Sequence, residues 1–278
     1  MTHPLPRRIA IAGLGLMGGS LGLALRVALP SARIVGIDSD PATASLALAR
    51  GAATEIAPDL DAIPPDTDLV AIAVPPGAAA GVVSRVAPRL PDGALLIDLS
   101  SVMLPAHHPR RVATHPLAGG ESSGIGAARA DLYAGCTVLI EGTIDAETPG
   151  ARAAELWTAL GARPVAIAPA LHDALVALTS HLPYAASVAL VRTLRRTGSM
   201  TQSLAEAAGP GLRDTIRIAG SPSALWADIL TLNGPKLIPA LELLEREVRA
   251  LRHAIAEGGP ALREHLEDAR AFREELSR

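Results

Sequence analysis

The sequence predicts a two-domain α/β protein, in which a doubly wound sheet is followed by a domain made only of helices. Three observations support this prediction. Short apolar runs alternate with helical stretches over residues 1–168, and the first run ends in a cluster of glycines. Over residues 169–278 no strand candidate remains and helical periodicity takes over. We therefore expect a domain boundary between residues 168 and 169.

The first domain is expected to alternate strands and helices with right-handed crossovers. Its strands are predicted at residues 9–12, 33–37, 69–74, 94–98, 137–141 and 164–168, and its helices at 21–29, 41–50, 79–89 and 147–160. The strands are nearly continuous apolar runs, which is typical of parallel strands buried on both faces. Residues 115–124 contain a proline and three glycines, so they predict a shaped loop rather than a strand.

The second domain carries two apolar stripes with heptad-like spacing. They comprise Leu237, Leu241, Leu244, Val248, Leu251 and Ile255, followed beyond a Gly-Gly-Pro break by Leu262, Leu266, Ala269 and Leu276. Each stripe could pack within its own domain or pair with the same stripe of a second copy. We expect the second arrangement, a homodimer through the C-terminal helices.

Composition excludes several partners. The net charge of -3 gives no basic surface for nucleic acid or an anionic membrane. Cys136 is the only cysteine, so an intrachain disulfide or a cysteine-based metal site is impossible, and no metal is expected. The first eight residues lack the apolar run of a secretion signal. We expect a cytoplasmic protein with no membrane partner.

A dinucleotide fingerprint follows the first predicted strand. Gly13, Gly15 and Gly18 have the spacing that provides a tight turn, backbone approach to a pyrophosphate and close helix packing. Asp38 ends the second strand about twenty residues further on, where a carboxylate accepts hydrogen bonds from a ribose. Ser39 rather than arginine follows it, which favours NAD over NADP. The predicted Rossmann-type site comprises Gly13, Leu14, Gly15, Leu16, Met17, Gly18, Asp38, Val74 and Pro75.

Two histidines and a serine are candidates for chemistry. His115 opens the predicted loop, and the alternative is a surface turn with a chance histidine. Ser101 follows a strand that ends at Asp98, and a helix N-cap is the alternative reading. His181 precedes Pro183 within a predicted helix, so a kink is expected that could aim the imidazole at a cleft. A core histidine is the alternative there.

Arg217 lies among apolar residues and therefore needs an anionic partner. That partner is either Asp214 within the fold or a carboxylate of the substrate.

Taken together, these motifs resemble the prephenate/arogenate dehydrogenase family of tyrosine biosynthesis, from Gly13 to about Asp228. The resemblance rests on the glycine loop, the serines after Asp98, residues 115–124, residues 180–183, and residues 214–219 with Trp226. It implies that His115 and Ser101 hold the 4-hydroxyl of the substrate. It also implies that His181 lies near the side-chain end, that Arg217 binds a carboxylate, and that Glu121 guards the pocket. Met103 and Tyr184 depart from the residues that the family often has at these positions.

The resemblance implies oxidative decarboxylation of prephenate to 4-hydroxyphenylpyruvate, with hydride transfer to NAD. A neutral imidazole is the usual base for a hydroxyl proton. Arogenate dehydrogenase is the nearest alternative. A β-hydroxyacid dehydrogenase would need an asparagine four residues after a helical lysine, and Lys236 has Ala240 there. A non-catalytic NAD-binding module is the third alternative.

Overall fold

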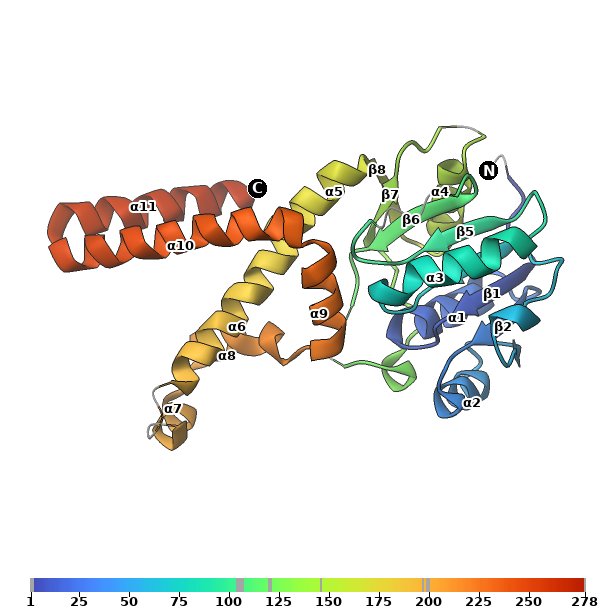
Figure 1. The fold of residues 1–278 in the computed structure, drawn as a ribbon, viewed down its shortest axis with the longest axis horizontal. Helices are drawn as coiled ribbons and strands as arrows, with labels where there is room; N and C mark the ends of the chain where they lie inside the picture. Colours follow the sequence, from blue (N-terminus) through green and yellow to red (C-terminus); the bar gives the residue numbers. More distant parts are fainter. Residues whose placement is uncertain are drawn as a thin grey trace.

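The computed structural model describes residues 3–103, 108–119, 122–145, 147–196, 198 and 201–277. Within these ranges the chain forms an eight-stranded sheet with the order β3-β2-β1-β4-β5-β6-β7-β8 (Figure 1). The strands are β1 (Arg8–Ala12), β2 (Arg33–Ile37), β3 (Glu55–Ile56), β4 (Leu69–Ile72), β5 (Leu95–Asp98), β6 (Arg111–Pro116), β7 (Thr137–Glu141) and β8 (Arg163–Ile167). Strands β1 to β6 are parallel, whereas β7 is antiparallel to β6 and parallel to β8.

Helices cover both faces of the sheet. They are α1 (Leu16–Ala28), α2 (Pro41–Ala49), α3 (Pro76–Val86) and α4 (Pro149–Ala159), with short 3-10 turns η1 (Leu60–Ala62), η2 (Ala87–Arg89) and η3 (Ile125–Ala127). Alternate residues of β1 point to opposite faces, which gives two apolar clusters. Ile9 and Ile11 pack with α1, α2 and α4, and Ala10 and Ala12 pack with α3. The predicted doubly wound fold is therefore confirmed.

The second domain consists of helices throughout its described part. These are α5 (Pro169–Val176), the π-helical turn η4 (Ala177–His181), α6 (Leu182–Arg195), α7 (Thr201–Ala207), α8 (Pro210–Ile216), the 3-10 turn η6 (Arg217–Gly220), α9 (Ser223–Leu232), α10 (Gly234–Glu257) and α11 (Gly259–Leu276). In Figure 1, α5, η4 and α6 form one long diagonal, and the antiparallel pair α10 and α11 projects away from the sheet.

The loop predicted for residues 115–124 begins later than expected. His115 lies in β6, a strand that the sequence pattern did not predict, and the chain leaves the sheet only after Pro116. The strand forms because Val112 and Ala113 are buried and the backbone pairs with β5 and β7 on its two sides. This pairing is non-local, so it outweighs the weak local strand signal of the sequence.

The helix after the glycine turn also differs from its prediction. Helix α1 begins at Leu16 rather than at residue 21, because the glycines at 18, 19 and 22 are part of the helix. A Cβ atom on Gly22 would overlap the carbonyl of Ala52, so this glycine allows close packing. The kink expected at His181 appears as the π-helical turn η4, which interrupts regular helical hydrogen bonding between α5 and α6.

Candidate active site

The glycine turn after β1 is shaped by contacts that leave no room for side chains. Gly13 has a φ of 90°, and a Cβ atom there would lie 2.5 Å from the carbonyl oxygen of Ala73. A Cβ on Gly18 would overlap the carbonyl oxygen of Gly13. Gly15 is different, because nothing lies within 4 Å of its Cβ position. Backbone atoms therefore fill the space beside Gly13 and Gly18, whereas the space beside Gly15, at the start of α1, is open.

The first turn of α1 offers donors to an anion. Gly15 is the N-cap and provides no side-chain hydrogen bond, so the N–H groups of Leu16 and Met17 have no acceptor within the helix. The positive end of the helix dipole adds to their attraction for a phosphate. These N–H groups and the open space next to the Cβ position of Gly15 fit a dinucleotide pyrophosphate.

Asp38 lies next to this turn and already has two backbone donors. Its Oδ2 accepts the N–H of Leu14 at 2.7 Å, and its Oδ1 accepts the N–H of Asp40 at 2.9 Å. The side chain of Leu14 is fully buried in the core. The N–H and the side chain of Leu14 are therefore both engaged within the fold, whereas each Asp38 oxygen retains a second lone pair.

His115 and His172 form a direct contact between the two domains. His115 Nδ1 lies 2.8 Å from His172 Nε2, and the two rings meet edge to face with centroids 5.1 Å apart. His115 stands near the carboxyl end of β6, and His172 is a completely buried residue of α5. His172 thus contacts Nδ1 of His115 and not its second ring nitrogen, Nε2.

Asp173 continues this contact and links it back to the first domain. Its Oδ1 lies 2.8 Å from His172 Nδ1 and accepts the N–H of Met103 at 3.0 Å. Met103, one of the two departures from the family pattern, also packs with Ala113 and Ile167. Asp173, His172 and His115 therefore form one hydrogen-bonded row across the domain junction.

Asn233 connects this row to His181. Its Nδ2 donates to the carbonyl oxygen of Asp173 at 2.9 Å and lies 3.0 Å from His181 Nδ1. Asn233 is 2% exposed and His181 is 1% exposed. The ring of His181 meets Trp226 edge to face, and Tyr184, the second departure, stacks flat on Trp226 with centroids 3.7 Å apart.

Both candidate histidines are held neutral. Burial, followed by the neighbouring imidazoles of His172 and His181, lowers the pKa of His115 to about 3. Burial also lowers the pKa of His181 to about 4, although the carboxylate of Asp173 partly opposes the shift. At neutral pH each ring therefore has one nitrogen that donates and one that accepts.

Ser101 extends from the strand next to His115. Strand β5 ends at Asp98, whose register partner in β6 is Ala113, so Ser101 follows the carboxyl end of β5 and His115 lies near that of the adjacent strand β6. Asp98 is fully buried, and its Oδ2 accepts a hydrogen bond from Arg111 Nη2 at 2.9 Å. Val102 and Met103, which follow Ser101, are not helical, and residues 104–107 lie outside the described part of the chain, so the N-cap alternative stays untested.

The remaining two predicted residues are placed less directly. Arg217 begins the turn η6, which packs against α6 and α8, and its role as a carboxylate ligand stays a prediction. Glu121 lies outside the described residues. Among the predicted chemical residues, the structure thus brings His115 and His181 into one network, and Ser101 lies on the segment that follows the adjacent strand β5.

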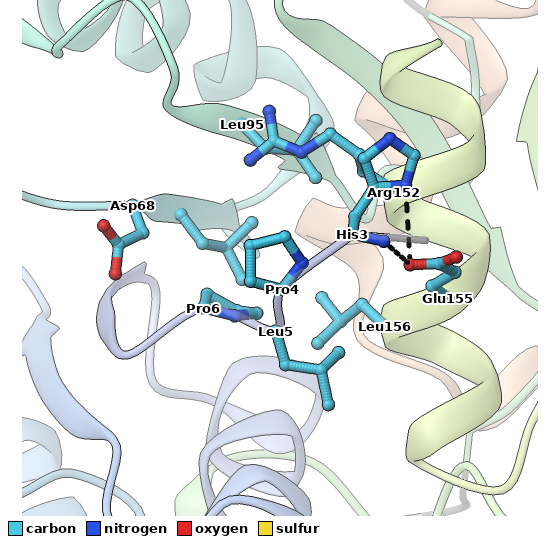
Figure 2. Close-up of a pocket in the computed structure, with 10 residues that line it drawn as sticks. His3, Pro4, Leu5, Pro6, Asp68, Leu95, Arg152, Glu155 and Leu156 are labelled. Atoms are coloured by element: carbon cyan, nitrogen blue, oxygen red, sulfur yellow. Dashed lines mark hydrogen bonds and ion pairs between the residues drawn. The ribbon is translucent and has the colours of Figure 1, made fainter. Parts of the chain in front are cut away.

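A small pocket lies at the amino ends of the strands, where β4 and β5 begin. Pro4, Leu5 and Leu156 line it, and His3 bonds to Glu155 at its rim (Figure 2). Open α/β sheets place ligands at the carboxyl ends of their strands. The pocket is therefore distinct from the candidate active site.

The helical run Pro169–Arg195 is, within the described ranges, the one segment with the length and apolar composition of a membrane span. Central helices of other proteins meet the same criterion. The polar groups of His172, Asp173 and His181 within this run bond to protein partners in β6, in the loop after β5 and at the N-cap of α10. These bonds favour the arrangement of a central domain helix.

The described residues contain no group of three or more side chains suited to hold a metal ion.

Sequence reasoning missed three members of this network: His172, Asp173 and Asn233. The first two stand in an ordinary amphipathic helix, where adjacent polar residues carry no motif. Asn233 is the only asparagine of the chain. Its burial at the start of a helix could not be predicted from its spacing to other residues.

The fold and site define a dinucleotide-dependent oxidoreductase with a helical second domain. Residues 21–166 match the family model described as prephenate dehydrogenase, nucleotide-binding domain, and residues 168–268 match prephenate dehydrogenase, dimerization domain. The cyclohexadienyl dehydrogenase of Zymomonas mobilis is 32% identical over 96% of this chain and 95% of its own length. The chain belongs to the prephenate dehydrogenase family.

Solved structures agree with this assignment. A prephenate dehydrogenase from A. aeolicus, in complex with hydroxyphenyl propionate and NAD+, has a TM-score of 0.88 at 28% identity and covers 99% of this chain and 100% of its own. The arogenate dehydrogenase of Synechocystis has a TM-score of 0.79 at 25% identity, with 97% and 99% covered. The predicted family and its oxidoreductase class are confirmed.

Proposed function

We propose that this chain oxidatively decarboxylates prephenate to 4-hydroxyphenylpyruvate, with NAD+ as the hydride acceptor, in tyrosine biosynthesis. Family membership supports the reaction, and the A. aeolicus relative binds NAD+ together with a hydroxyphenyl acid. The observation that carries the proposal is the buried, neutral His115 beside the carboxyl edge of the sheet, with one ring nitrogen bonded to His172.

The first domain would bind the cofactor at its glycine turn. The N–H groups of Leu16 and Met17 would hold the pyrophosphate, and Asp38 would accept a hydrogen bond from a ribose hydroxyl. Val74 and Pro75, which link β4 to α3 beside Gly13, would line the adjoining wall. When bound, NAD+ supplies a nicotinamide ring that accepts a hydride.

His115 would act as the general base. Its Nε2 takes the proton of the substrate's 4-hydroxyl while the hydrogen on the same carbon leaves as hydride. The bond between the ring and its carboxylate then breaks, carbon dioxide departs, and the electron pair passes through the ring to the oxygen. The proton returns from His115 to this oxygen, which gives the phenol. A positioned base of this kind contributes roughly 10²–10⁴-fold.

The other predicted residues would bind the substrate. Ser101 would share the 4-hydroxyl with His115, and His181 would lie toward the side chain. Arg217 would pair with a carboxylate, and Glu121 would guard the pocket. Two neutral imidazoles and the guanidinium of Arg217 suit a dianion such as prephenate better than an ammonium-bearing substrate.

Arogenate is the alternative substrate, because relatives are named both cyclohexadienyl and arogenate dehydrogenase. The deciding experiment measures kcat/KM for prephenate and arogenate, each with NAD+ and NADP+. We expect prephenate with NAD+ to give the highest value. A tenfold preference for arogenate would overturn the substrate assignment while leaving the reaction type intact.

The role of His115 is tested by His115→Asn. We expect the variant to fold and to bind NAD+, but to lose two or more orders of magnitude in turnover. Circular dichroism and cofactor titration control for folding and binding. Turnover close to the wild-type value would refute the general-base assignment.

The division at residues 168 and 169 and the homodimer are also part of this proposal. Residues 168–268 match a dimerization domain, and α10 and α11 leave large apolar side chains exposed. Val248, Ile255 and Phe272 are each 60% exposed. Sedimentation equilibrium is expected to find a dimer, and a monomer at micromolar concentration would contradict it. A reducing cytoplasm suits a chain whose only cysteine is Cys136.

A further inference from the structure

The row Asp173–His172–His115 has a defined direction of donation. Asp173 Oδ1 accepts the N–H of Met103, and an ionised carboxylate oxygen can only accept. His172 Nδ1, 2.8 Å from the same oxygen, must therefore carry a proton and donate it. In a neutral His172 ring, Nε2 is then the acceptor. The nitrogen that faces it, His115 Nδ1, must donate in turn.

This direction fixes the tautomer of His115. With its proton on Nδ1, a neutral His115 has a lone pair on Nε2. That nitrogen is the one not engaged by His172, so it is available to take a proton from a substrate. The opposite tautomer would present N–H there and could not act as a base.

Asn233 fixes the second imidazole in the opposite sense. Its amide group faces the carbonyl oxygen of Asp173 at 2.9 Å, and a backbone carbonyl can only accept. The amide orientation is therefore set, with Nδ2 toward Asp173 and toward His181 Nδ1. Nδ2 has two hydrogens and no acceptor lone pair, so His181 Nδ1 must accept. A neutral His181 then carries its proton on Nε2.

We propose that Asp173, His172 and Asn233 are positioning residues that hold His115 and His181 in opposite tautomers. His115 presents a bare Nε2 that accepts a proton, and His181 presents an Nε2–H that donates to an oxygen of the substrate. The use of these nitrogens rests on the proposed function, but the tautomers themselves do not.

Both domains contribute to this assignment. Met103 supplies its N–H from the loop after β5, His115 comes from β6, and Asn233 is the N-cap of α10.

The competing arrangement places a second proton on His172. His172 would then donate from both nitrogens, and His115 would accept at Nδ1 and carry its proton on Nε2. The two arrangements differ at every nitrogen of His115.

The test reads the tautomers without substrate. Protein labelled with [15N]histidine is studied by two-dimensional NMR at neutral pH, and signals are assigned by their loss in His115→Asn, His172→Asn and His181→Asn. We expect a protonated Nδ1 and an unprotonated Nε2 for His115, and the reverse for His181. A protonated Nε2 on His115, a doubly protonated His172 or a protonated Nδ1 on His181 would each overturn the proposal.

Two variants of Asp173 distinguish a positioning role from a purely structural one. Asp173→Asn keeps an oxygen that can accept both N–H groups, so the His115 tautomer and most of kcat should survive. Asp173→Ala removes the acceptor and should lower kcat about tenfold or more, with KM for prephenate changed less than about twofold. Equal losses in both variants, or a loss confined to KM, would contradict the positioning role.

Asn233→Asp tests the second histidine. It places a carboxylate against His181 Nδ1, so the proton should move to that nitrogen and the NMR pattern of His181 should reverse. Gln202→Glu, which adds the same charge at an exposed position of the same domain, should leave the pattern unchanged. An unchanged His181 pattern in folded Asn233→Asp would refute the assignment. Because these readouts need no turnover, their failure is distinguishable from failure of the proposed reaction.

Discussion

The protonation state of His115 should make turnover insensitive to mild acid. Burial and the neighbouring imidazoles lower the pKa of His115 to about 3, against about 6.5 for an ordinary histidine. The shift favours the neutral ring, so the base is lost only as the pH falls through the lowered value. His181, with its pKa lowered to about 4, is neutral over the same range.

The size of the effect follows from these values. At about pH 5.5, an ordinary histidine is neutral in roughly one molecule in eleven, and kcat/KM would fall about tenfold from its value at neutral pH. A base with a pKa near 3 is still more than about 99% neutral at that pH. We therefore expect kcat/KM for prephenate to change less than about twofold between about pH 7.5 and 5.5.

The assay follows the absorbance of reduced cofactor in initial rates, at constant ionic strength and low prephenate concentration. Enzyme kept at the acid pH and returned to neutral pH must recover full activity, which excludes unfolding as a cause of any loss. An acid limb with a midpoint near 6.5 would show that His115 is not held neutral by its surroundings. The burial argument would then be wrong.

Three further variants test other parts of the site. Gly18→Ala should weaken NAD+ binding and lower the free energy of unfolding by about 1–3 kcal/mol, because its Cβ would overlap Gly13. Gly126→Ala is the control: its Cβ position has open space, so the free energy of unfolding should change by less than about 0.5 kcal/mol. Urea unfolding measures the stability of each variant, and cofactor titration measures its NAD+ binding. Asp38→Ala combined with Ser39→Arg should erode the preference for NAD+ over NADP+, and a wild-type enzyme that already prefers NADP+ would contradict the assignment of Asp38. Arg217→Ala should mainly raise KM for prephenate, by tenfold or more, and loss of folding with KM unchanged would make Arg217 structural.

Local patterns predicted the cofactor half of the molecule well. The glycine turn depends on steric conditions that only glycine meets, so its spacing carries the structure almost completely. Gly13 and Gly18 confirm this, because each would bring a side chain against backbone. Strand β6 was missed because Arg111 and His115 interrupt its apolar pattern, and its stability comes from partners on both sides rather than from its own residues.

The helical half of the site was harder to predict, because helical phase depends on a single irregular turn. Residues 172 and 181 are nine apart, about two and a half turns of a regular α-helix, which would place them on opposite sides. The wider π-helical turn η4 changes this phase just before His181. Asn233 can then bond both to His181 and to the carbonyl of Asp173. No spacing rule for a regular helix would have grouped these residues.

The candidate site is divided between the sheet and the helical part of the chain, so the proposed chemistry would need both. Strand β6 carries His115, but the groups that bury the ring and bond to it lie on α5 and beyond. The docking is held by polar contacts close to the site, since the N–H of Met103 bonds to Asp173 and Asp228 of α9 accepts the N–H of Gly77 at the start of α3. A carboxylate at that helix start is also favoured by the helix dipole. Separating the domains would expose His115 to water. Its pKa would then lie closer to the ordinary value, and His172 would no longer fix its tautomer. The helical domain therefore does more than complete the fold, because it buries and bonds to the imidazole that the sheet presents.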